Sequence, residues 1–104
     1  MNKYWKLEGK KVVECKDVME WGEFFEGENR FINSTEILEG TIRVSTVFLG
    51  IDHSFAQFSN EPLIFETMVF GGSMDQETDR YSTYEQAEAG HQKMVDAVRE
   101  NLKN

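Results

Sequence analysis

Residues 30–38 and 41–51 have the hydrophobic pattern of two half-buried β-strands, with one face of the pair more apolar than the other. The dipeptide Glu39-Gly40 between them is typical of a two-residue turn, so the two strands are predicted to form an antiparallel hairpin. This register places Glu36 opposite Arg43 on one face. On the other face it pairs Ile37 with Ile42, Thr35 with Val44, and Phe31 with Phe48. We therefore expect the second face to form the core and the first face to meet water.

Residues 47–49 and 68–70 are apolar at every position. Stretches of this kind belong to central strands whose two faces are both covered. A helix packed on the sheet covers only one of these faces. The other face is then covered either by the amino-terminal segments or by a second subunit, so a homodimer is one of two alternatives.

The segment that begins at Asp17 has the spacing of a short amphipathic helix. Asp17 lies three residues before Glu20, the arrangement of a capping box, and Gly27 offers a carboxy-terminal stop. The apolar stripe of this helix consists of Val18, Trp21, Phe24 and Phe25. We expect the aromatic residues to pack into the core and the intervening glutamates to point elsewhere.

A longer helix is predicted over residues 84–102, with Thr83 as its cap and Gln86 at the capping-box position. One face carries the apolar stripe Ala87, His91, Met94, Val95, Val98 and Leu102. Gly90 in the middle of this helix costs about 1 kcal/mol relative to alanine. We expect that it permits a close approach of the helix to the sheet, and that His91 is a hydrogen-bonded core residue rather than a ligand.

The remaining segments complete an α+β fold. Residues 3–15 predict a β-hairpin with a turn at Gly9, and residues 80–82 predict a short returning strand. The expected order is β-β-α-β-β-β-β-α in a single domain, residues 1–104. An antiparallel sheet of about four to six strands would carry the long carboxy-terminal helix on one face.

The 104 residues carry a net charge of -8, and this charge is unevenly distributed. Residues 17–39 hold seven acids against Arg30 alone, a net charge of -6, whereas residues 1–16 have a net charge of +3. Direct binding of nucleic acid is disfavoured, because phosphate contacts need clustered lysine and arginine. Two interpretations of the acidic segment remain: a solvated face that maintains solubility, or a docking surface for a basic protein.

The chain lacks the motifs of the common enzyme classes. With two histidines and one cysteine, no dedicated transition-metal site is expected, and no glycine-rich phosphate loop or nucleophile elbow suggests a cofactor or covalent catalysis. We therefore expect a protein that is not an enzyme and needs no metal or cofactor. Neither a signal peptide nor an apolar run of about 20 residues is present, which predicts a cytoplasmic protein without a membrane partner.

Two further positions are candidates for binding or for local structure. The loop over residues 52–62 carries His53 and Phe55, and loops on rigid scaffolds commonly carry binding residues. Glu66 lies in an otherwise apolar strand and needs a partner, since burial of an unpaired charge is costly. We expect this partner to be Arg43 on the neighbouring strand, in a structural network with Glu36.

Three segments resemble a family of small proteins from bacteriophage and prophage genomes: RVSTVFLGIDHSF at 43–55, PLIFETMVFGG at 62–72 and RYSTYEQAEAGHQKMV at 80–95. The amino-terminal YWKL and DVMEWGEFFE segments fit the same family. The resemblance brings no catalytic residues. It implies a phage or prophage setting in the cytoplasm of a bacterial host, where small acidic proteins often act by binding, for example as inhibitors of a host defence complex such as a CRISPR effector.

Three hypotheses for function follow. The first is a non-enzymatic module that binds a host or phage protein through an acidic face formed by Glu20, Glu23 and Glu26. The second is a small-ligand binder or nucleotide-signal sponge, with the candidate binding residues Arg43, His53, Phe55, Glu66, Tyr81 and His91. The third is an enzyme with Glu66 or His91 as acid or base, for which no nucleophile, metal or cofactor site is apparent. An accessory phage role outside these classes stays open.

Overall fold

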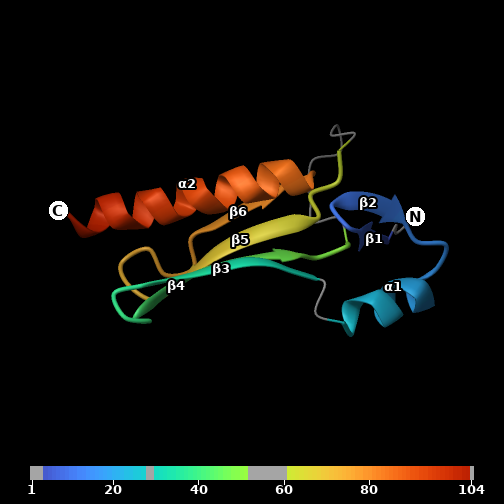
Figure 1. The fold of residues 1–104 in the computed structure, drawn as a ribbon, viewed down its shortest axis with the longest axis horizontal. Coiled ribbons are helices and arrows are strands. Elements are labelled where there is room, and N and C mark those ends of the chain that lie inside the picture. The colour runs from blue at the N-terminus through green and yellow to red at the C-terminus, as the bar shows by residue number, and fades with distance from the viewer. Residues whose placement is uncertain (1–3, 28–29, 52–60, 104) are drawn as a thin grey trace.

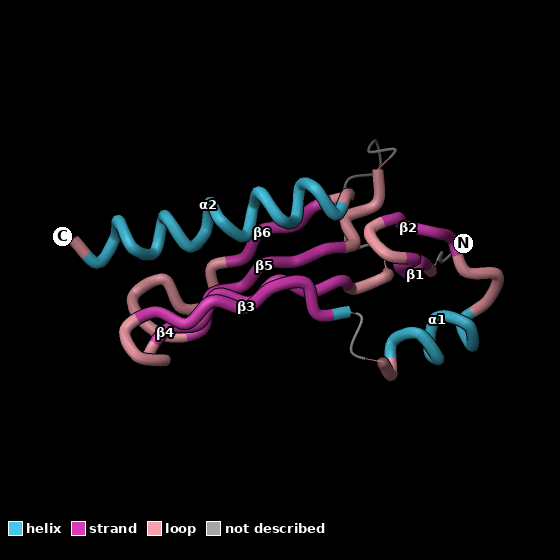
Figure 2. Tube along the Cα trace, in the orientation of Figure 1, coloured by secondary structure: helices cyan, strands magenta, loops and turns pink. Residues whose placement is uncertain are grey.

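The fold is built on a four-stranded antiparallel sheet in the order β3-β4-β5-β6. The structure is a computed structural model that describes residues 4–27, 30–51 and 61–103. The strands are β3 (Phe31–Ile37), β4 (Ile42–Phe48), β5 (Phe65–Phe70) and β6 (Thr78–Tyr81). Consecutive strands are neighbours throughout, so the sheet is a simple meander (Figures 1 and 2).

The hairpin β3–β4 has the predicted register over most of its length. Ile37 pairs with Ile42 and Glu36 with Arg43. The turn closes with a hydrogen bond of 3.1 Å from Thr41 N to Leu38 O, and both central residues have positive φ, as the hairpin twist requires. The predicted pairing of Phe31 with Phe48 is wrong: a bulge between Phe31 and Asn33 pairs Phe31 with Val47 instead. Phe31 consequently lies on the opposite face and is 56% exposed.

Helix α2 (Tyr84–Leu102) runs along one face of the sheet (Figure 1). Its predicted capping box is confirmed: Gln86 N donates to Thr83 Oγ1 at 3.1 Å and Thr83 N donates to Gln86 Oε1 at 3.3 Å. The apolar stripe is also confirmed, except that Leu102 is 40% exposed near the carboxy-terminal end. Beneath α2, one cluster of the core consists of Ile37, Ile42, Val44, Val69, Val95 and Val98.

Gly90 permits the close packing that its position predicted. A Cβ atom at this residue would overlap the ring of Tyr81 on β6. Gly90 and its neighbour His91 are both buried at this contact. The low helix propensity of glycine is thus tolerated because a larger side chain would push α2 away from β6.

The amino-terminal elements join the end of the sheet. Strands β1 (Trp5–Glu8) and β2 (Lys11–Glu14) form a separate two-stranded sheet, and α1 (Val18–Phe25) follows them. Trp5 N donates to Gly50 O at 2.8 Å just after β4. The second core cluster spans this junction and consists of Leu7, Phe48, Ile64, Phe65 and Ala87. The α+β class and the predicted order of elements are confirmed, with two sheets in place of one.

The molecule is elongated, with principal extents of 47 × 31 × 19 Å, and α1 and the carboxy-terminal end of α2 lie toward opposite ends of the long axis (Figure 1). Within the part of the chain that the structure describes, α2 lies along one face of the four-stranded sheet and no helix lies along the other face. The described amino-terminal segments pack at the end of the sheet and not along this second face, which argues against the first of the two predicted alternatives.

Candidate functional site

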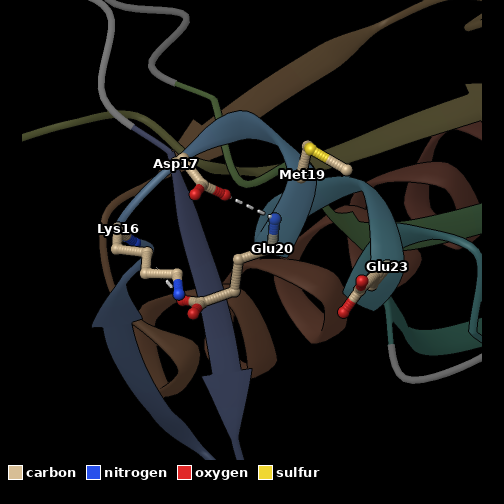
Figure 3. Close-up of a pocket in the computed structure, with 5 residues that line it drawn as sticks. All are labelled: Lys16, Asp17, Met19, Glu20 and Glu23. Carbon is tan, nitrogen blue, oxygen red and sulfur yellow. Dashed lines mark hydrogen bonds between the residues drawn. The ribbon is translucent and has the colours of Figure 1, made fainter.

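Helix α1 is fixed at its start by hydrogen bonds from its own neighbourhood. Asp17 has extended backbone angles, and its Oδ1 accepts a hydrogen bond of 2.9 Å from Glu20 N. The Glu20 carboxylate turns back and accepts a hydrogen bond of 3.3 Å from Lys16 N (Figure 3). The reciprocal arrangement is close to the predicted capping box, with Lys16 in place of Asp17 as the backbone donor.

Two aromatic residues, Trp21 and Phe24, attach α1 to the rest of the molecule, and a third, Phe25, stacks on Trp21 within the helix. The indole nitrogen of Trp21 donates to Leu49 O at 3.3 Å. Trp21 also stacks on Phe25 with a centroid distance of 4.7 Å, and Phe24 contacts the Phe48 ring edge-on at 5.7 Å. Edge-to-face and offset aromatic pairs contribute about 0.5–1.5 kcal/mol each beyond their burial. The inner face of α1 is thereby held in one orientation.

The outer face of α1 combines an exposed methionine with carboxylates. Met19 is 74% exposed and Val18 is 50% exposed. Met19, Glu23 and Glu26 follow one another at i, i+4 and i+7, so they lie on one side of the helix. A shallow hollow of about 290 Å³ lies here, lined by Lys16, Asp17, Met19, Glu20 and Glu23. Met19 and Glu23 point away from the Glu20–Lys16 contact (Figure 3).

The three glutamates of the predicted acidic face do not have equivalent surroundings. Glu20 accepts the Lys16 hydrogen bond, lies 3.9 Å from Lys6 Nζ, and has a side chain that is 29% exposed. Glu23 and Glu26 are exposed. Glu20 therefore stabilises the start of α1, while Glu23 and Glu26 present their charge to the solvent. Met19 was not recognised as a site residue from the sequence, although an apolar residue on an acidic helix face is a signal that could have identified it.

The predicted partner of Glu66 is wrong. Glu66 accepts a hydrogen bond from Arg80 Nε at 3.0 Å, because the β5–β6 register places these two residues opposite each other. Arg43 lies opposite Phe70 instead, with its guanidinium 4.9 Å from the centre of the Phe70 ring. Glu66 and Arg43 both lie on the sheet face that α2 does not cover.

His91 lies on the covered face of the sheet, where both ring nitrogens have partners. Nδ1 is 2.7 Å from Thr46 Oγ1 and Nε2 is 2.8 Å from Thr35 Oγ1. Thr46 Oγ1 is in turn 2.5 Å from Thr67 Oγ1. The chain of hydroxyls and imidazole crosses three strands beneath α2, and His91 is 1% exposed. Burial lowers the pKa of His91, so the ring is neutral at pH 7.

The candidate ligand-binding residues are therefore distributed over two faces. Arg43 and Glu66 lie on the uncovered face, whereas His91 and Tyr81 lie toward α2. Burial raises the pKa of the Tyr81 phenol. His53 and Phe55 fall outside the described residues. The four described candidates do not line one common pocket.

A second shallow hollow, of about 420 Å³, lies between the edge strand β6 and α2. It is lined by Asp79, Arg80, Tyr81, Gln86, Ala89, Gly90 and Lys93. Of these residues only Tyr81 was a candidate from the sequence. Among the residues that the structure describes, no three acidic, histidine or cysteine side chains are grouped as a metal site would require.

Cys15 is expected to react slowly with thiol reagents while the protein is folded. The residue is 7% exposed, and burial, followed by the nearby Glu20 carboxylate, raises the pKa of its thiol. Because the thiolate is the reactive form, a raised pKa lowers the reaction rate at pH 8. Alkylation by iodoacetamide, followed by mass spectrometry, should be at least about tenfold slower than for the chain unfolded in urea. Equal rates would show that Cys15 is accessible.

Comparison with protein-family models, curated proteins and solved structures finds no match to this chain. None of the described helices is both long and apolar enough to cross a membrane.

Proposed function

We propose that this protein acts by binding another protein, without catalysing a reaction, and that the outer face of α1 is its docking surface. The observation that carries the proposal is Met19, which is 74% exposed on a helix whose inner face is held by Trp21 and Phe24. Glu23 and Glu26 follow Met19 along the same side of the helix with two exposed carboxylates. A partner with an apolar pocket surrounded by lysine and arginine fits this surface.

Each part of the surface contributes differently to binding. A methionine side chain is unbranched and adapts to irregular apolar pockets, so it is suited to be the central contact. Carboxylates around such a contact mainly accelerate association with a basic partner and exclude acidic ones. Because α1 is already fixed by its cap and its aromatic contacts, binding requires little ordering of the helix, which favours affinity.

The resemblance to bacteriophage and prophage proteins suggests the class of partner. In a bacterial cytoplasm, a small protein of this kind would act on a host defence protein, such as a CRISPR effector, and inhibit it by occupying a basic surface. Defence complexes that handle nucleic acid carry basic surfaces, because they must contact phosphates. The acidic face of α1 would compete for such a surface.

Reversal of two charges on α1 tests the proposal. The variant Glu23→Lys/Glu26→Lys is expected to lower recovery of a bacterial partner in an affinity pull-down, quantified by mass spectrometry, by about tenfold or more, since charges that meet a partner of opposite sign become repulsive. Met19→Ala should lower it as well by removing the central apolar contact.

The matched control is Glu39→Lys/Glu77→Lys, which changes the net charge equally at two exposed turns of the opposite end of the sheet. It should recover the partner as the unmodified protein does. Glu20 is excluded from the test because its replacement would loosen the start of α1. Equal recovery by all variants, or no partner recovered by any, would contradict the assignment of α1.

A further inference from the structure

The sheet face that α2 leaves uncovered has an ordered pattern of side chains. On β4 and β5 the residues alternate strictly between buried positions toward α2 and more exposed positions on this open face. The registers define which residues of the open face are neighbours: Phe31 with Val47, Ser45 with Met68, and Arg43 with Phe70. Side chains that lie opposite each other in a sheet share a face.

Four apolar residues form a diagonal stripe across the open face. Phe31 on β3 lies beside Val47 on β4, and the line continues through Met68 to Phe70 on β5. Phe31 is 56% exposed and Phe70 is 41% exposed, and the other two residues are half-buried. Four apolar side chains in one line across three strands make a continuous contact surface rather than scattered exposure.

Pairs of opposite charge occupy the two sides of the diagonal stripe. On one side, Glu66 and Arg80 form an ion pair of 3.0 Å. On the other side, Glu36 lies opposite Arg43 in the β3–β4 register. These four charges are two acids and two bases, and Arg30 adds a third base, with its guanidinium 4.6 Å from the centre of the Phe31 ring at one end of the stripe. The face is therefore close to neutral, on a chain whose net charge is -8.

We infer that the open face binds a second copy of this chain, related to the first by a two-fold axis along the diagonal stripe. Rotation about this axis places the stripe of one copy on the stripe of the other. The same rotation places the Glu66–Arg80 side of one copy over the Glu36–Arg43 side of the other. A two-fold interface requires this kind of self-complementary patch.

A second copy fits this face better than a strongly charged partner does. A partner of one sign would meet one favourable and one unfavourable charge on each side of the stripe. With strands about 4.8 Å apart and residues about 3.3 Å apart along them, the face measures roughly 450 Å² in projection. Stable complexes bury about 800 Å² per partner, so we expect a dimer with a dissociation constant in the micromolar range. The inference is independent of the α1 surface.

Sedimentation velocity over about 1 to 500 µM protein tests the dimer, with the range chosen for a micromolar interface. The unmodified chain is expected to shift from monomer to dimer across this range. Met68→Lys places two lysines against each other near the axis and should weaken the dimer by about tenfold or more. The control Leu102→Lys changes a residue that is 40% exposed near the end of α2, and it should leave the dimer unchanged.

Exchanging the acid and the base within each pair tests the relative orientation of the two copies. Each copy still has an acid opposite a base, so the pair within the chain is retained. Glu66→Arg/Arg80→Glu reverses one side of the stripe and should weaken the dimer. Adding Glu36→Arg/Arg43→Glu reverses the other side and should restore it. Circular dichroism and thermal melts would verify that each variant is folded. A monomer at every concentration, an unaffected Met68→Lys variant, or a four-residue exchange that fails to restore the dimer would overturn the inference.

Discussion

Replacement of Gly50 by alanine is expected to destabilise the protein by about 2–5 kcal/mol. Gly50 has φ of +71°, a conformation that costs other residues about 1–2 kcal/mol. A Cβ atom there would also overlap the indole nitrogen of Trp21 and lie 2.6 Å from Trp5 O. The backbone of β1 at Trp5 and the Trp21 side chain of α1 would both have to move. This movement adds the cost of overpacking, typically about 1–3 kcal/mol.

The variant Gly9→Ala separates the cost of the positive φ from the cost of the steric overlap. Gly9 has a similar φ of +63°, but nothing lies within 4 Å of the position of its Cβ. Its replacement should cost about 1–2 kcal/mol from the backbone conformation alone. Urea denaturation of the two variants gives the difference, and near-UV circular dichroism should show a disturbed tryptophan environment only for Gly50→Ala. Equal losses would show that the amino-terminal elements adapt freely at Gly50.

His91→Leu is expected to lower the free energy of unfolding by about 2–4 kcal/mol at pH 7.5, because two hydroxyls lose their partner and an unsatisfied buried group costs about 1–3 kcal/mol. Leucine fills a similar volume, so the loss comes mainly from Thr35 and Thr46. Thr46 retains Thr67, which limits the effect. Thermal and urea denaturation measure this loss.

The same variant should change the dependence of stability on pH. Burial lowers the pKa of His91 in the folded protein below its value of about 6.5 in the unfolded chain. Between pH 6.5 and the lower pKa of the folded state, His91 binds a proton in the unfolded chain but not in the folded protein. The free energy of unfolding of the unmodified protein is therefore at its full value above pH 6.5 and falls as the pH drops through this range. The His91→Leu variant has no such titrating group, so the difference in free energy of unfolding between the two proteins should be smaller at pH 5 than at pH 7.5. Parallel curves would contradict the burial of a neutral imidazole.

Gly50 and His91 lie at the two junctions that position the proposed surfaces. Gly50 lies where α1 and β1 meet the end of β4, so the orientation of Met19 depends on it indirectly through Trp21. His91 connects α2 to three strands of the sheet and thus holds the covered face together. The open face lies on the other side of those strands. Binding through α1 and pairing through the open face can therefore be disturbed separately.

Local features of the chain were predictable from sequence because their causes are local. The caps at Asp17 and Thr83 depend on side chains three residues away, and the β3–β4 register depends on one short turn. The apolar stripe of α2 follows from its helical period, and Gly90 indicated a close contact. These signals determined the α+β class and the order of the elements.

Only the tertiary structure decided which distant residues meet. The partner of Glu66 follows from the β5–β6 register, and the bulge at Phe31 moves an expected core residue to the open face. The surroundings of Glu20 depend on Lys6 from another strand, and the exposure of Met19 depends on how α1 docks. The sequence by itself determined the elements, because hydrogen bonding and periodicity act over a few residues. The three-dimensional packing determined the candidate surfaces, because contacts between distant segments leave no fixed spacing in the chain.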